Sequence, residues 1–331
     1  MSAVQQLLHQ TNKLIPSLDA EILLAHVLKK PREFLLIHPE FVPSAAQVKK
    51  FNALARRRAL GEPVAYLIGH KEFFGLDFAV DKRVLVPRPE TELLVEEALA
   101  VIARSEATKQ SQSDKKIKKL AASQQLQKSK IKNRDTVLID IGTGSGCVPI
   151  AIIKTLKHKN IKTIAIDISQ DALAVARRNA RAHGVKIKFL HGNLLSPLLN
   201  KSYMLHVTCC NNTIITANLP YLPGVVRPGR AKKTGGWKEW KNNCSMETRG
   251  LKFEPSQALF TGNHGLQLYE ELLQQITKVV SCYKLHVTCL LEFDPRQTTR
   301  LKKLIKKYLP GASVEIKKDL AGRDRVAVLS C

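Results

Sequence analysis

The tetrapeptide Asn218-Leu219-Pro220-Tyr221 follows an apolar run and combines an amide, a rigid turn and an aromatic ring. The Asn218 amide is a poor acid or base, but its oxygen can accept a hydrogen bond. Pro220 favours an extended Leu219, which sets the direction of the Leu219 carbonyl. These two acceptors could hold both N–H groups of a planar –NH₂ and aim its lone pair at an electrophile, with Tyr221 against the substrate plane. The plainer alternative is a strand that ends in a proline turn with a buried tyrosine.

A second candidate site lies upstream, in the stretch VLIDIGTGSGCVPIAI. Glycines between a strand and a helix let the backbone approach a ligand, and the turn is expected to present N–H groups at the helix N-terminus. The next strand ends in an acid that could accept both hydroxyls of a ribose, and a third strand ends in residues expected beside an adenine. The candidate cofactor-binding residues are Gly142, Thr143, Gly144, Ser145, Gly146, Asp167, Asn193, Leu194 and Asn218.

These residues indicate a nucleoside cofactor, but they do not separate a dinucleotide from S-adenosylmethionine. The tetrapeptide at the fourth strand end favours S-adenosylmethionine. Methyl transfer to a neutral nitrogen requires alignment of the two reactants and little acid–base chemistry. No metal is expected, because none of the seven cysteines forms a Cys-x-x-Cys pair.

Strands and helices alternate along the chain in the way that positions such a site. Apolar runs and helical periodicity predict strands at 136–142, 162–169, 186–193, 213–218 and 285–294, with helices at 147–157, 170–184, 265–280 and 295–309. The fold class is therefore α/β, with a parallel sheet covered on both faces. Two final strands, 313–318 and 324–330, are expected to add an antiparallel edge strand. The repeated pentapeptide LHVTC, at Leu205 and Leu285, has no physical explanation, although its second copy fits a buried strand.

The N-terminal region is predicted to be a separate helical domain, residues 1–72, joined by a hairpin-like connector, 73–90, to a domain over 91–331. Asp19 and Ser44 are expected to cap helices, and Gly61 to end one. Pro, Thr91 and Glu residues are expected to begin another amphipathic helix within PRPETELLVEEALAVI. Ser, Gln and Lys dominate the stretch near 104–135, which reads as an insertion.

The net charge of +25 suggests an acidic partner such as RNA or the ribosome. About half of the excess lies in basic insertions near 104–135 and 225–245, so nonspecific RNA or ribosome contact is expected there if anywhere. No signal peptide or run of about 18 apolar residues is present, which favours a cytoplasmic protein without membrane contact.

Three longer stretches carry a resemblance to a known family. RRRALGEPVAYLIGHKEFFGLDFAVDKRVLVPRPETELLVEEAL, EPSQALFTGNHGLQLYEELL and KDLAGRDRVAV resemble the HemK-type glutamine methyltransferases that modify peptide chain release factors. The resemblance covers nearly the whole chain apart from the basic insertions and the segment near Leu205. It implies a seven-stranded Rossmann-like methyltransferase domain that uses S-adenosylmethionine, and a helical domain that helps to dock the release factor.

By this resemblance the substrate clamp is Asn218 to Tyr221, and the product is N(5)-methylglutamine in the Gly-Gly-Gln loop of the release factor. The PRPETE segment, Pro87 to Glu92, is expected to support the site. The family usually has proline where Leu219 stands and aspartate where Asn193 stands. Both departures leave the required acceptor groups in place.

Two alternatives stay open. Asn-Leu-Pro-Tyr is also the spelling found in ribosomal RNA adenine dimethyltransferases, so an RNA or DNA adenine amino-group methyltransferase is the main rival. An inactive, basic, ribosome-associated binding protein is the second. The long helical domain, the GEPVAYLIG and PRPETE stretches, and Asp140 before the glycine turn favour methylation of release factors.

Overall fold

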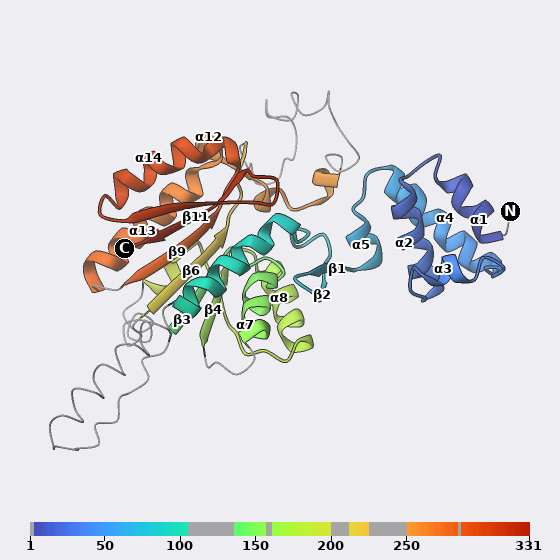
Figure 1. The fold of residues 1–331 in the computed structure, drawn as a ribbon, viewed down its shortest axis with the longest axis horizontal. Coiled ribbons are helices and arrows are strands. Elements are labelled where there is room, and N and C mark those ends of the chain that lie inside the picture. Colours follow the sequence, from blue (N-terminus) through green and yellow to red (C-terminus); the bar gives the residue numbers. More distant parts are fainter. Residues whose placement is uncertain (1–2, 105–135, 157–160, 200–211, 225–249, 284–285) are drawn as a thin grey trace, which may run out of the picture. The chain divides into compact units, whose positions relative to one another are not determined.

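The computed structural model describes residues 3–104, 136–156, 161–199, 212–224, 250–283 and 286–331. Both basic insertions, at 105–135 and 225–249, and the first LHVTC copy lie outside these residues. The chain forms two compact units, each described by itself (Figure 1). One unit contains residues 1–71, 79–86 and 227–256, and the other contains 72–78, 87–226 and 257–331.

The first unit is helical, as its amphipathic sequence predicts. Leu23, Leu24 and Phe51 are fully buried at its centre. Ser44 caps the fourth helix in a capping box with Gln47, and Gly61 follows the end of that helix with φ of 98°. The helices are α1 (Ala3–Thr11), α2 (Ser17–Leu28), α3 (Phe34–Ile37), α4 (Ala45–Ala59) and α5 (Val64–Ile68).

The expected cap at Asp19 is wrong. Helix α2 begins at Ser17, two residues earlier, and no side chain caps it. Asp19 instead accepts a hydrogen bond from Nε of Arg58 in α4 over 2.7 Å, and both side chains are largely buried. The Asp19 carboxylate therefore pairs with the distant Arg58 guanidinium and does not cap the helix.

The second unit is built on a seven-stranded sheet in the order β10-β11-β9-β6-β3-β4-β5. Five strands run parallel, and β11 runs antiparallel to both of its neighbours. This confirms the predicted α/β class with a seven-stranded, mostly parallel sheet. The strands are β3 (Thr136–Ile141), β4 (Lys162–Asp167), β5 (Lys188–His191), β6 (Asn212–Asn218), β9 (Val287–Glu292), β10 (Ser313–Lys318) and β11 (Asp324–Ser330).

Helices cover both faces of the sheet, and the alternation of strand residues decides which core each side chain joins. Along β3, Val137 and Ile139 belong to the core beneath helices α13 (Gln267–Tyr283) and α14 (Thr298–Tyr308). Leu138 belongs to the core beneath α7 (Cys147–Leu156) and the helix over residues 92–104. Figure 1 shows the two helical layers. The helices are α7 (Cys147–Leu156), α8 (Gln170–Ala182), α13 (Gln267–Tyr283), α14 (Thr298–Tyr308) and residues 92–104.

The antiparallel strand is not at the edge, contrary to expectation. Strand β11 lies between β9 and β10, and β10 is the edge strand. Five central residues of β11 are buried, whereas β10 is mostly exposed. The more apolar of the two final strands therefore takes the inner position.

Short elements complete the described chain. Within η1, Thr91 stands immediately before the helix over 92–104, as the PRPETE stretch predicts. The short strands are β1 (His70–Phe73), β2 (Leu76–Ala79), β7 (Leu222–Pro223) and β8 (Phe260–Thr261). The short helices are η1 (Pro89–Thr91), η2 (Ser196–Leu198), η4 (Leu251–Phe253), η5 (Ser256–Ala258), α12 (Gly262–Gly265) and η6 (Pro295–Gln297).

The parallel strands bring their carboxyl ends to one edge of the sheet. Ile141, Asp167, His191, Asn218 and Glu292 are the last residues of β3, β4, β5, β6 and β9. All candidate site residues therefore meet at this edge. Within the described part of the chain, none of the helices has the length and apolar character that crossing a membrane requires.

Candidate active site

The carboxamide of Asn218 is held in one orientation by a residue far away in sequence. Its Nδ2 donates a hydrogen bond to Oγ1 of Thr91 over 3.0 Å, and Thr91 is 3% exposed. Because the nitrogen takes this partner, the Asn218 oxygen is turned away from Thr91 and can accept from another group. The Thr91 hydroxyl also interacts with the carboxylate of Glu292, which can accept its single proton. A lone pair of Thr91 then faces Asn218, and only the –NH₂ end of the amide can donate to it.

The carbonyl of Leu219 is the second acceptor of the predicted clamp. The hydroxyl of Tyr269 lies 3.4 Å from this oxygen and also receives the N–H of Leu219 over 3.2 Å. Tyr269 has one proton, and its short hydrogen bond to the carbonyl of Glu292 takes that proton. The Leu219 carbonyl therefore keeps its capacity to accept. The Leu219 side chain is buried, so this position offers only main-chain atoms.

The backbone at Tyr221 is fixed from the other side. Its carbonyl accepts a hydrogen bond from Nε2 of Gln297 over 2.9 Å, and the same nitrogen donates to the carbonyl of His264 over 2.9 Å. Gly265 approaches so closely that an added Cβ would overlap the Tyr221 carbonyl oxygen and Nε2 of Gln297. Burial, followed by the charge of Glu292, raises the pKa of the Tyr221 phenol to about 12. The ring is therefore neutral at physiological pH.

The glycine turn folds as predicted, but its N–H groups have other partners. Gly142 and Thr143 donate to the carbonyl of Ile166, and Gly146 donates to that of Thr143. The expectation that the turn presents these N–H groups to a ligand is therefore wrong. What the turn offers is close approach. A Cβ on Gly144 would meet nothing nearer than a carbonyl oxygen at 4.0 Å, so that side of the backbone is open.

Asp167 links the turn to the second strand end. Its Oδ2 accepts from the N–H of Gly144 and its Oδ1 from that of Ser169, each over 2.8 Å. Both oxygens retain a lone pair for a further donor. Burial raises the pKa of this carboxyl, against the opposing effect of the two backbone donors. Ser145 is buried, and its carbonyl accepts from Nδ2 of Asn179.

Asn193 and Leu194 follow β5, beside this carboxylate. The N–H of Gly192 donates to the carbonyl of Asp167 over 3.0 Å, which joins the two strand ends. Asn193 is exposed, whereas the Leu194 side chain is 5% exposed and packs into the core with φ of 53°. A contact from position 194 to an adenine would therefore come from its backbone.

Two buried acids flank the site. Asp140 accepts from Oγ1 of Thr216 over 2.6 Å, and burial raises the pKa of Asp140 to about 7. Glu292 lies opposite Asn218 in the register of β6 and β9, and burial raises its pKa to about 7 as well. The sequence reading passed over Glu292, Tyr269 and Gln297. An acid that ends the mostly apolar and buried strand VTCLLE is the signal that could have revealed Glu292.

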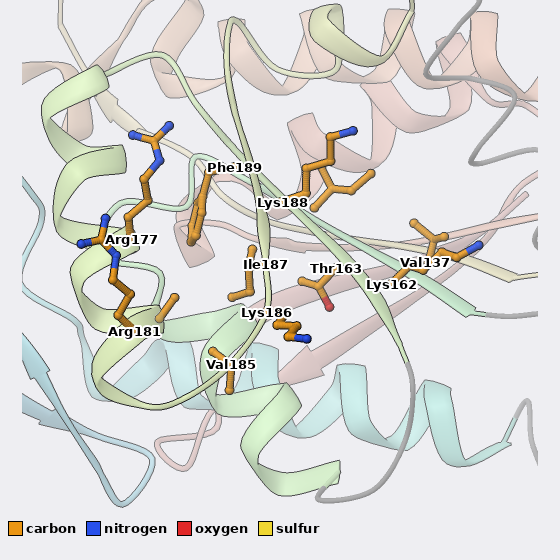
Figure 2. Close-up of a pocket in the computed structure, with 12 residues that line it drawn as sticks. Val137, Lys162, Thr163, Arg177, Arg181, Val185, Lys186, Ile187, Lys188 and Phe189 are labelled. Carbon is orange, nitrogen blue, oxygen red and sulfur yellow. The ribbon is translucent and has the colours of Figure 1, made fainter.

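A cavity of about 760 Å³ lies elsewhere, between α8 and the β4–β5 edge. Figure 2 shows Arg177 and Arg181 extending from α8, with Lys162 and Thr163 on the far side. Those last two residues begin β4, whereas Asp167 ends it. The cavity is therefore at the opposite end of the strand from the candidate site. No cluster of three or more metal-ligating side chains occurs among the described residues.

Comparison with known proteins agrees with this geometry. Residues 138–228 match the family model of a methyltransferase domain, and residues 2–69 match that of the PrmC N-terminal domain. The fold and the site thus define an S-adenosylmethionine-dependent methyltransferase of the seven-stranded class.

Individual relatives narrow this class. The release factor glutamine methyltransferase of Nitratidesulfovibrio vulgaris is 33% identical over 313 residues, which cover 94% of this chain and 86% of that protein. The enzyme of the same name from Bacillus cereus is 30% identical over 306 residues, 92% of this chain and 89% of that protein. A bifunctional methyltransferase of Rickettsia felis is 32% identical over 316 residues, 95% of this chain but 54% of that protein. The chain belongs to the release factor glutamine methyltransferase family.

The residues present fit the cofactor of this class. The buried carboxylate of Asp167 has a free lone pair on each oxygen, which suits two ribose hydroxyls. The open backbone at Gly144 lies next to it and leaves room for a ligand. The N–H groups of Gly142, Thr143, Gly144 and Gly146 already have partners in the protein. Donors for the cofactor would therefore come from other main-chain groups and from the exposed Asn193.

Proposed function

We propose that the protein transfers a methyl group from S-adenosylmethionine to the side-chain amide nitrogen of the glutamine in the Gly-Gly-Gln motif of peptide chain release factors. S-adenosylmethionine supplies an electrophilic methyl group on a sulfonium. The relatives from Nitratidesulfovibrio vulgaris and Bacillus cereus are named for a release factor and a glutamine, and the chain is similar to them over more than nine-tenths of its length. A cytoplasmic location, where translation occurs, is part of the proposal.

The observation that carries the proposal is the fixed amide of Asn218 beside the Leu219 carbonyl. A primary amide is a weak nucleophile, because its nitrogen lone pair is delocalised into the carbonyl. Two acceptors that hold its N–H groups stabilise the positive charge that develops on nitrogen and orient the lone pair. The methylated nitrogen then loses one of its protons to water or to a neighbouring acceptor, which restores the neutral amide.

The side chain of Leu219 also packs against the glycine turn that is expected to bind the cofactor. Its Cδ2 would lie 3.2 Å from a Cβ added at Gly142, so the clamp strand packs directly against the start of the glycine turn. The acceptor pair and the cofactor-binding turn are therefore held at one distance by core packing. This is the preorganisation that an in-line transfer requires.

The helical unit is proposed to dock the release factor. Nine large apolar side chains are well exposed among the described residues, and six of them lie between positions 14 and 60. Exposed apolar side chains favour contact with a protein partner, because covering apolar surface lowers the free energy. The six are Leu14, Leu18, Leu36, Ile37, Val42 and Leu60.

One observation favours a second candidate function, methylation of an adenine amino group in RNA. Leu219 gives the clamp the Asn-Leu-Pro-Tyr spelling of RNA adenine dimethyltransferases, and an adenine also carries a planar –NH₂. The five cationic side chains around the cavity in Figure 2 would suit a phosphate backbone. That cavity lies at the far end of β4 from the clamp, which makes it a poor guide to the substrate.

The test offers both substrates to the protein with S-adenosylmethionine labelled in its methyl group. A release factor and deproteinised ribosomal RNA are incubated separately and together, and label is followed in each. We expect label in the release factor, at the glutamine of Gly-Gly-Gln after proteolytic mapping. Label in RNA alone would overturn the proposal in favour of the second candidate.

A further inference from the structure

Of the two buried acids that flank the site, Glu292 is the one with a carboxylate oxygen left unsatisfied among the described residues, and the proposed reaction gives it no role. It is 1% exposed, and its Oε2 has no hydrogen-bond partner among the described residues. A buried carboxylate with an unsatisfied oxygen is costly, and natural proteins seldom keep one without a functional reason. Its position at the end of β9 therefore needs an explanation beyond packing.

Glu292 and Asn218 point to the same side of the sheet. They are register partners in the parallel pair β6–β9, and the same alternation places Leu290 and Ile214 in the core beneath residues 92–104. Thr91 stands where that helix begins, and it receives the amide nitrogen of Asn218 over 3.0 Å. The Thr91 hydroxyl also interacts with the Glu292 carboxylate, which partly offsets the upward effect of burial on the pKa of Glu292.

A threonine hydroxyl has one proton and two lone pairs. If the proton points to Glu292, a lone pair faces the Asn218 amide, and only the –NH₂ end of that amide can meet it. Without the carboxylate, the hydroxyl is free to turn and donate to the Asn218 oxygen. The amide would then rotate and present its –NH₂ end to the substrate.

We propose that Glu292 and Thr91 are positioning residues that lock the Asn218 carboxamide with its oxygen outward, and that this lock selects an –NH₂ acceptor over a carboxylate. The proposal rests on the proposed function, because it concerns the same acceptor site. With the oxygen outward, a glutamine side chain donates to the clamp. A glutamate side chain has only acceptors there, and it would meet the Asn218 oxygen with repulsion.

Several charged and titratable groups are close enough to Glu292 for their charges to interact with it. Arg88 and Glu90 lie before residues 92–104, and Arg325 lies on β11. Tyr269 on α13 and Tyr221 after β6 also feel its charge. Burial raises the pKa of Glu292 and the Glu90 charge adds to this effect, whereas the Thr91 hydroxyl and the two arginines favour the ionised carboxylate, whose oxygens can accept the Thr91 proton. Replacement by glutamine keeps an acceptor oxygen and removes the charge.

The experiment compares Thr91→Val, Glu292→Leu and Glu292→Gln with the wild type, using a release factor and a second one whose target glutamine is replaced by glutamate. Thr213→Val is the matched control, because Thr213 is equally buried on β6 and its hydroxyl has no partner among the described residues. Turnover, the dissociation constant of each release factor and that of S-adenosylmethionine are measured. Melting temperature and S-adenosylmethionine affinity show that each variant is folded.

We expect Thr91→Val and Glu292→Leu to lose about 10- to 100-fold in turnover, the range of one lost orienting hydrogen bond. Both should bind S-adenosylmethionine as the wild type does. The preference for the glutamine substrate over the glutamate one should fall by about tenfold. Glu292→Gln should recover most of the loss, and Thr213→Val should match the wild type.

An unchanged glutamine-to-glutamate preference in Thr91→Val would overturn the lock. If Glu292→Leu does not fold, Thr91→Val decides alone, since it removes a hydroxyl and keeps the side-chain shape. If the wild-type protein methylates no release factor, the proposed function itself is contradicted. This outcome is distinguishable from failure of the lock, because it is seen with the wild type alone.

Discussion

The carboxylate of Asp167 accepts the N–H of Gly144 over 2.8 Å, so one acidic side chain joins the second strand end to the glycine turn. This contact spans 23 residues of sequence and holds the turn next to the group that would bind a ribose. Loss of the carboxylate would therefore remove a ligand contact and loosen the turn together.

Replacement of Asp167 should weaken cofactor binding in two steps. Asp167→Asn keeps one acceptor oxygen and is expected to raise the dissociation constant of S-adenosylmethionine by about 10-fold, whereas Asp167→Ala should raise it by about 100-fold. Calorimetric titration measures both. Asp171→Ala, at an exposed position in the first turn of α8, is the control and should bind normally. Unchanged affinity in Asp167→Ala would exclude this carboxylate from the cofactor site.

Gly265 should tolerate no side chain, because its φ of 86° is left-handed and a Cβ would overlap the Tyr221 carbonyl and Gln297. Gly184 has φ of 65° but no atom within 4 Å, so it isolates the cost of the backbone conformation. We expect Gly184→Ala to lose about 1 kcal/mol of unfolding free energy with normal turnover. Gly265→Ala should lose more, together with most methyl transfer. Equal losses in the two variants would show that contact with Tyr221 does not matter.

The buried carboxyl of Asp140 should make stability depend on pH in a defined direction. Its pKa rises to about 7 in the folded protein, from about 4 when unfolded, so the folded state holds the proton more tightly. Its contribution to the unfolding free energy should therefore decrease from about pH 4 to about pH 7 and level off above. Because other carboxyls titrate too, the quantity to measure is the difference from Asp140→Asn. The unfolding free energy of Asp140→Asn, relative to that of the wild type, should rise between about pH 4 and about pH 7. A fall in this difference over the same range would contradict burial as the main cause of the raised pKa.

The helical unit should depend on the ion pair between Arg58 and Asp19. Removal of one partner from a largely buried pair leaves an uncompensated charge, so Arg58→Ala should cost about 3 kcal/mol of unfolding free energy. Arg57 lies on the same helix as Arg58, but its side chain is exposed where it pairs with Glu62. Arg57→Ala should therefore cost less than about 1 kcal/mol of unfolding free energy. Denaturant unfolding of the two variants tests this difference. S-adenosylmethionine affinity should be normal in both, since the cofactor residues belong to the other unit.

Local sequence signals were sufficient for the main strands and helices and for their order along the chain, but not for the position of β11 in the sheet. Apolar runs such as those ending at Asp167 and Asn218 predicted strands whose ends carry the candidate site, and the structure confirms those strands. Ser44 and Gly61 also act as the sequence predicts, because capping depends only on neighbouring residues. The roles assigned to the site residues remain predictions.

Contacts between distant segments escaped the sequence reading. The bond from Asn218 to Thr91 joins positions 127 apart, and the bond from Gln297 to Tyr221 joins positions 76 apart. The same limit explains Asp19, whose partner Arg58 is 39 residues away. Spacing along the chain says which residues stand at strand ends. It does not say which groups the folded protein has already hydrogen-bonded.

The most direct test of the clamp is methyl transfer to a release factor by Asn218→Ala, measured beside the affinity of that variant for S-adenosylmethionine. Because Asn218 supplies one of two acceptors for the substrate –NH₂, turnover should fall by about 100-fold or more while the cofactor dissociation constant stays within about threefold of the wild type. Turnover close to that of the wild type would contradict the account, because the substrate nitrogen would then be held by other groups.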